Sequence, residues 1–112
     1  MSSISSHVLD TSEGKPAAGI SIKIYSLEDE SWIFIYESGT NENGRTENID
    51  LIGKQNNSGI YKIIFETGQY FKSKNKNCFY PHVEIIFETM GDEHYHIPLL
   101  LSPFGYTTYR GS

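Results

Sequence analysis

The chain has 112 residues and a formal net charge of −5 at neutral pH. This length fits one domain, spanning residues 1–112, and a chain this short often gains stability by self-association. The acidic balance argues against nucleic acid as the main partner, and no apolar run approaches the roughly 20 residues that cross a membrane. We therefore expect neither nucleic acid nor a membrane as a partner.

The single cysteine, Cys78, has no partner for an internal disulfide. The fold therefore needs no oxidising compartment, and we interpret Cys78 as structural rather than as a reactive nucleophile. Residues 1–6 lack both the basic start and the apolar core of a signal peptide. These features predict a cytoplasmic protein.

Apolar and polar residues alternate with a period of two through most of the chain, and Gly, Asn and Pro stand between the runs. Segment 32–36 is aromatic or β-branched at every position, so we expect that strand to be covered on both faces. Short strands at regular spacing predict a β-sandwich. The expected strands cover residues 4–10, 20–25, 32–36, 45–51, 60–65, 82–89, 94–101 and 105–110.

The connections between these strands carry turn residues and one helical signal. Residues 41–44 (NENG) predict a tight turn, because Asn and Gly accept the positive φ that such turns require. Residues 53–59 predict a polar loop. The only expected helix covers residues 67–72, with Thr67 as its candidate N-cap. The predicted class is therefore all-β with one short helix.

Two of the four histidines stand close together on an expected strand. His94 and His96 are two positions apart, so they share one face of that strand, while Tyr95 and Ile97 share the other. Such a pair could bind zinc, but a zinc site needs a third and usually a fourth ligand. The sequence places neither Cys78 nor a carboxylate to complete that set, so we expect no metal.

Four segments together are distinctive: residues 6–11 (SHVLDT), 43–46 (NGRT), 94–103 (HYHIPLLLSP) and 109–112 (YRGS). On these segments the chain resembles the transthyretin-like family over about residues 5–112. Within that family it is similar to the hydrolytic branch, which acts on 5-hydroxyisourate in urate degradation. The last two segments are the most specific, and the Asn-Gly-Arg piece alone would be weak.

The resemblance implies a fold, an assembly and an activity. The fold would be a transthyretin-like (prealbumin-like) β-sandwich of two four-stranded sheets with one short helix. The assembly would be a homotetramer, built as a dimer of dimers with its active sites at the dimer–dimer interface. The activity would convert 5-hydroxyisourate to 5-hydroxy-2-oxo-4-ureido-2,5-dihydro-1H-imidazole-5-carboxylate, with no cofactor.

Matching the family motifs position by position also implies residue roles. The catalytic residues would be His7, Arg45 and His96. The substrate-binding residues would be those of the terminal tetrapeptide, Tyr109, Arg110, Gly111 and Ser112. Within it we expect Tyr109 to face the substrate and Arg110 to anchor the chain end by ion pairing. His82 and His94 have no catalytic counterpart.

These residue types suit the hydrolysis of a cyclic amide. A histidine with a pKa near neutrality can take a proton from water and return it to the leaving nitrogen. Arg45 is always charged and can stabilise the oxyanion that forms. The sequence leaves open which histidine is the base.

Two other functions compete with hydrolysis. The first is a transthyretin-like carrier of a thyroid hormone-type aromatic molecule, whose channel should be lined by apolar and small residues. The second is a structural or adhesive β-sandwich module, which would need no convergent polar residues. The joint presence of His7, Arg45, His96 and the terminal motif favours the enzyme.

Overall fold

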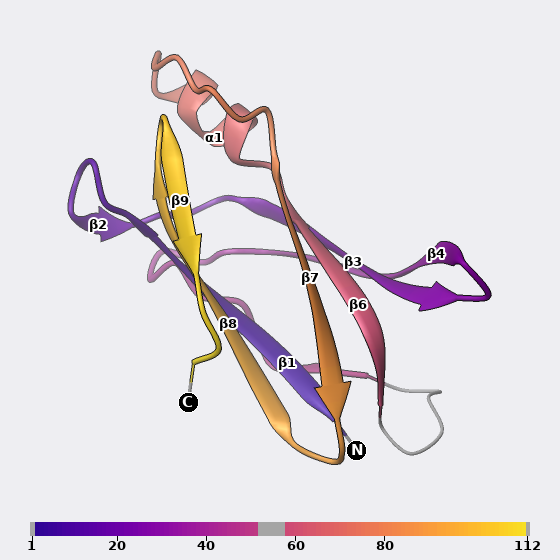
Figure 1. Ribbon diagram of the computed structural model, residues 1–112. Coiled ribbons are helices and arrows are strands. Elements are labelled where there is room, and N and C mark those ends of the chain that lie inside the picture. Colours follow the sequence, from indigo (N-terminus) through magenta and orange to yellow (C-terminus); the bar gives the residue numbers. More distant parts are fainter. Residues whose placement is uncertain (1, 52–57, 112) are drawn as a thin grey trace.

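The computed structural model describes residues 2–51 and 58–111, and it folds as two β-sheets with one short helix (Figure 1). The first sheet has the order β2-β1-β8-β9, with β5 also paired to β1; its strands are β1 (Ser3–Asp10), β2 (Lys15–Pro16), β5 (Ile49–Asp50), β8 (His94–Ser102) and β9 (Gly105–Thr108). The second sheet has the order β4-β3-β6-β7; its strands are β3 (Ser21–Glu28), β4 (Ser31–Gly39), β6 (Ser58–Phe65) and β7 (Val83–Met90). This architecture confirms the predicted sandwich of two sheets with one short helix. The first sheet has five described strands rather than the expected four, because the short strands β2 and β5 both pair with β1.

Alternation along the strands places the core between the two sheets. On β3 the residues Ile22 and Ile24 are buried, and their register partners on β6 are Phe65 and Ile63, which are buried too. The intervening positions on these strands are partly exposed. The period-two pattern in the sequence therefore reports which face of each strand packs inward.

Strand β8 pairs with β1 in parallel, and this pairing positions the histidines. Their register sets Ser5 opposite His96 and His7 opposite Pro98. Tyr95 on β8 is 5 % exposed and faces the core, whereas His94 is exposed on the opposite face. The predicted division of β8 into a histidine face and an apolar face is confirmed.

The prediction that segment 32–36 is covered on both faces is wrong. It lies in β4, an edge strand that pairs only with β3 in the described part of the chain. Ile33 is 47 % exposed and Phe34 is 52 % exposed. In Figure 1 the β3–β4 hairpin extends to the right of the view, away from β1 and β8. The aromatic and β-branched residues of segment 32–36 correctly predicted a strand. Whether the faces of that strand are buried depends on which other segments pack against them.

Two further segments differ from the sequence expectation, and a third lies largely outside the described residues. The strand expected over 45–51 is reduced to β5, Ile49–Asp50, since residues before it form a turn against β1. The helix α1 covers Thr67–Ser73, so Thr67 is its first residue and Glu66 is the N-cap. The Thr67 hydroxyl is buried and makes no hydrogen bond. The polar loop expected over 53–59 falls largely on residues 52–57, which lie outside the described residues.

A buried carboxylate joins the helix to the end of β1. Asp10 is fully buried and accepts hydrogen bonds from the Tyr70 hydroxyl at 2.8 Å, the Ser12 backbone N–H at 3.0 Å and the Glu13 backbone N–H at 3.3 Å. Burial by itself raises the pKa of Asp10, but the hydrogen bonds from Ser12, Tyr70 and Glu13 outweigh it and hold that pKa below its ordinary value. The aspartate of the His-Val-Leu-Asp segment is therefore structural.

We predict that Asp10→Ala lowers the free energy of unfolding by about 3 kcal/mol, because it leaves buried donors without a partner. A depressed carboxyl pKa stabilises the fold above the ordinary value of 3.8 and loses that effect as the pH falls through the folded-state value. The difference in free energy of unfolding between wild type and Asp10→Ala should therefore become smaller at acid pH. Urea unfolding at several pH values measures it, with the exposed Asp50→Ala as control. Equal urea midpoints for Asp10→Ala and wild type would refute this role.

Candidate active site

The turn before Arg45 is fastened to the outer edge of β1. The Val8 N–H donates to the Gly44 carbonyl at 2.8 Å, and His7 forms a β-bridge with Arg45. Gly44 has φ +74°, and a Cβ there would stand 2.5 Å from the Val8 carbonyl oxygen. Only glycine tolerates both the dihedral and this close approach. The Asn-Gly-Arg segment thus places Arg45 beside His7.

The chain end is fastened to β8 in a similar way. The Gly111 N–H donates to the His96 carbonyl at 2.8 Å, and the two residues form a β-bridge. A Cβ at Gly111 would lie 2.6 Å from His96 Cδ2. The backbone of the terminal segment therefore packs directly on the His96 ring, and glycine is required there for space.

The three residues assigned to catalysis come together from three separate segments. The pKa of His96 lies below its ordinary value because of burial first, and then because of the positive charge of Arg45, with smaller contributions from His7 and His94. Burial followed by the charge of Arg45 also lowers the pKa of His7. Both imidazoles are consequently neutral at neutral pH and can accept a proton.

A shallow polar pocket of about 260 Å³ opens beside this group. Arg45 and His96 line it, and so do Ser5 and His94. The remaining lining residues are Ser6, Thr46 and Asn48. His7 is not among its lining residues, although its β-bridge to Arg45 keeps it adjacent. The pocket thus offers the exposed guanidinium of Arg45 and a neutral imidazole to a polar ligand.

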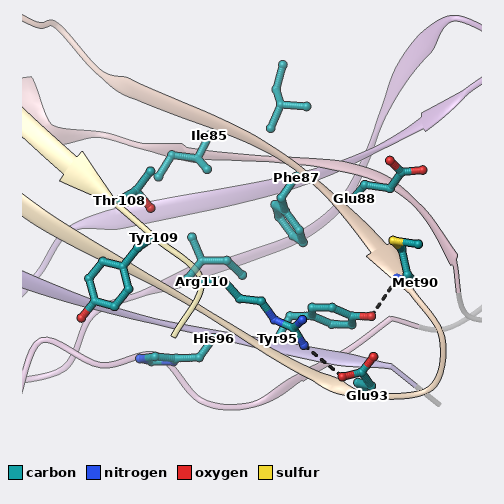
Figure 2. A pocket seen from close by; sticks show the side chains of 12 residues that line it. Ile85, Phe87, Glu88, Met90, Glu93, Tyr95, His96, Thr108, Tyr109 and Arg110 are labelled. Atoms are coloured by element: carbon teal, nitrogen blue, oxygen red, sulfur yellow. Dashed lines mark hydrogen bonds and ion pairs between the residues drawn. The ribbon is translucent and has the colours of Figure 1, made fainter. Parts of the chain in front are cut away.

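A second pocket, of about 300 Å³, lies on the other side of His96, between β7 and the chain end (Figure 2). Tyr109 and Arg110 line this pocket rather than the polar one. Arg110 Nη2 lies 3.0 Å from Glu93 Oε1, and its guanidinium stacks 4.7 Å from the centre of the Tyr95 ring. Figure 2 shows Tyr109 directed away from Arg110, and Tyr109 is 56 % exposed.

The structure therefore brings four of the assigned residues together: His7, Arg45, His96 and Gly111. Tyr109 and Arg110 reach only the neighbouring pocket, and Ser112 lies outside the described residues. Within the described ranges, no three His, Cys, Asp or Glu side chains are grouped to hold a metal ion. No described helix is long and apolar enough to cross a membrane.

Sequence reasoning missed the hydroxyl groups that contact the histidines. Ser5 Oγ lies 2.9 Å from His96 Nδ1 and 2.9 Å from His94 Nε2. The spacing of Ser3, Ser5 and His7 along β1 puts all three on one face, which was a usable signal. Their contact with His94 and His96 depends on the parallel pairing with β8, which the sequence did not reveal.

A β-sandwich that gathers two neutral imidazoles and a guanidinium beside a polar pocket defines a small-molecule hydrolase rather than a structural module. The sequence profile of the HIUase/Transthyretin family matches residues 4–111. The chain belongs to the HIUase/Transthyretin family.

Individual relatives agree with this membership. The chain is 46 % identical to a probable 5-hydroxyisourate hydrolase of Schizosaccharomyces pombe, over 97 % of this chain and 90 % of the relative. It superposes on the structure of Klebsiella pneumoniae 5-hydroxyisourate hydrolase with a TM-score of 0.84 and 33 % identity, covering 98 % of this chain and 99 % of that one. It also matches an (S)-allantoin synthase structure with a TM-score of 0.87 and 37 % identity, covering 99 % of this chain but 44 % of that longer chain.

We predict that Arg45→Gln raises the pKa of both His7 and His96. Removing a neighbouring cation makes the imidazolium less unfavourable, so each pKa moves up towards its ordinary value. The recovery should be partial, because burial is the larger cause for both rings. Titration followed by histidine ring NMR signals measures the shifts, with Lys72→Gln on α1 as the control. An unchanged His96 pKa in Arg45→Gln would contradict this electrostatic account.

Proposed function

We propose that this chain hydrolyses 5-hydroxyisourate to 5-hydroxy-2-oxo-4-ureido-2,5-dihydro-1H-imidazole-5-carboxylate. The observation that carries the proposal is the convergence of His7, His96 and Arg45, with both imidazoles held neutral. The names of the Schizosaccharomyces and Klebsiella relatives support the same reaction. The single family domain is proposed to extend over residues 1–112.

The site's groups match the steps of amide ring opening. Water adds to a ring carbonyl carbon, and a neutral imidazole takes one of the water protons. The guanidinium of Arg45 compensates the oxyanion that forms. The carbon–nitrogen bond then breaks, the leaving nitrogen receives the proton from the imidazolium, and a carboxylic acid and a ureido group result. The imidazole ends the cycle neutral, and the new carboxylic acid releases its own proton to water to become the carboxylate.

The carrier function fits the polar pocket poorly. A guanidinium and imidazoles beside the ligand would be desolvated by an apolar aromatic molecule without gaining partners. The same groups suit a heterocycle rich in carbonyl and N–H groups, which replaces their lost water contacts. The chemistry of this pocket therefore supports hydrolysis over carriage.

We also propose that the active form is a homotetramer, a dimer of dimers with active sites at the dimer–dimer interface. Large exposed apolar side chains support self-association, among them Ile86 at 59 %, Met90 at 75 % and Phe104 at 71 % exposure. A cytoplasmic location is proposed as well, supported by the free thiol of Cys78.

We predict that His7→Ala, Arg45→Ala and His96→Ala each lower kcat about 10²–10⁴-fold with the fold retained. The ultraviolet absorbance of freshly generated 5-hydroxyisourate follows the reaction, and circular dichroism checks the fold. The rate should rise with pH with its midpoint below the ordinary imidazole value of 6.5, because the neutral ring is the active form. His94→Ala should cost far less. An inactive His94→Ala beside an active His96→Ala would show that the assignment is wrong.

We predict that deleting residues 109–112, or adding a bulky tag after them, abolishes hydrolysis more than it lowers stability. Gly111 packs on the His96 ring, so loss of the segment frees that ring, while few core contacts are removed. Turnover, thermal midpoint and light-scattering mass are compared for the full-length, truncated and extended chains. Normal turnover after truncation would contradict this role, and a fully active full-length monomer would contradict the tetramer.

A further inference from the structure

A chain of hydrogen bonds runs from His96 along the paired strands β1 and β8, and Ser5 and His94 line the polar pocket together with His96. Ser5 Oγ lies 2.9 Å from His96 Nδ1 and, on its other side, 2.9 Å from His94 Nε2. Ser3 Oγ lies 2.6 Å from His94 Nδ1. The chain leads from the partly buried His96 to the exposed His94. The motif matches gave none of Ser3, Ser5 and His94 a role.

The single proton of a hydroxyl group limits how this chain can be arranged. Ser5 can donate to only one of its two ring nitrogens, so the other ring must donate an N–H to Ser5. If His96 donates from Nδ1, its Nε2 is bare and can act as a base. If His94 donates from Nε2, then Ser5 donates to His96 Nδ1, and His96 carries its proton on Nε2. At Nε2, the ring nitrogen left for the substrate, His96 is therefore a base in the first arrangement and an acid in the second.

We propose that Ser5 and His94 form a proton relay that switches His96 between a base with a bare Nε2 and an acid with an Nε2–H. The proposal deepens the hydrolytic function above and rests on it. In the forward step, Nε2 of His96 takes a proton from the attacking water. The Nδ1 proton of His96 passes to Ser5, and the Ser5 proton passes to His94 Nε2. His96 is then neutral and His94 carries the positive charge; the reverse transfers follow when Nε2 gives its proton to the leaving nitrogen.

Electrostatics gives this transfer its direction. A positive charge kept on His96 would lie beside Arg45 and beside His7, both of which lower the pKa of that ring. His94 is exposed, so water can solvate the charge there. On the other side of His96, the charge of Arg110 is already paired with Glu93 at 3.0 Å. The relay therefore moves the positive charge from the partly buried His96 to His94, an exposed residue in the lining of the same pocket.

Steady-state kinetics against pH tests the relay with the full-length protein. Ser5→Ala should lower kcat about tenfold or more with less than about a threefold change in KM, because Arg45, His96 and the other lining residues of the pocket are kept. Ser5→Thr keeps the hydroxyl and should stay within about threefold of wild type. His94→Gln keeps a hydrogen-bonding partner that cannot take up the charge, so it should lower kcat by about tenfold. Ser102→Ala, at the far end of β8, is the matched control.

A proton inventory in mixtures of light and heavy water gives a second, independent readout. A relay moves several protons in one step, so the wild-type rate should depend on the deuterium fraction along a curve. In Ser5→Ala only one proton moves, so the dependence should become linear. A merely structural role for Ser5 would lower the rate without changing the shape of this dependence.

The outcomes separate the relay from the proposed function. If His96→Ala is inactive while Ser5→Ala keeps the wild-type kcat, pH profile and inventory, the relay is refuted and the hydrolase site stands. If Ser5→Ala and Ser5→Thr are both as inactive as His96→Ala, the relay is refuted in favour of a covalent role for the hydroxyl. If His96→Ala itself retains activity, the proposed site fails. Rescue by Ser5→Thr together with a curved wild-type inventory supports the relay.

Discussion

The parallel pairing of β1 with β8 is the constraint on which the site depends. It joins two segments that are about 90 residues apart in sequence, such as Ser5 and His96, whose hydrogen bond spans 91 positions. Once the register is set, every second residue of both strands faces the same side. A slip of one residue would turn His96 into the core and Tyr95 out of it. The buried apolar face of β8 therefore fixes the geometry of the histidine face.

Two further backbone contacts complete the site, and neither of them buries side chains in the hydrophobic core. The turn that ends at Gly44 lays Arg45 against β1, and the chain end lays Gly111 against His96. At both places a glycine allows a backbone approach that a side chain would block. The functional groups are thus carried on backbone that is hydrogen-bonded to β1 or β8, which limits their movement. For Arg45 this fixes the backbone beside His7, from which the exposed guanidinium reaches the pocket.

The sandwich alone does not decide the activity, because the family's own name covers both hydrolases and transthyretins. The decision lies in the charge distribution around His96. Burial first, and then the nearby guanidinium, lowers the pKa of both imidazoles and keeps them neutral, while the guanidinium remains as one strong cation to meet the developing anion. An apolar carrier gains nothing from such a group, whereas a hydrolase needs both the neutral base and the cation.

The sequence by itself determined most of the long strands, the faces of β3, β6 and β8, and the identity of His7, Arg45 and His96 as candidates, but not the short strands β2 and β5. These follow from local rules: alternation with a period of two, turn residues, and motif matches. The tertiary structure alone decided that β4 is an exposed edge, that Tyr109 and Arg110 line a different pocket from Arg45, and that Ser5 joins His94 to His96. Each of these depends on which distant segment lies opposite, and local sequence carries no information on strand order or register.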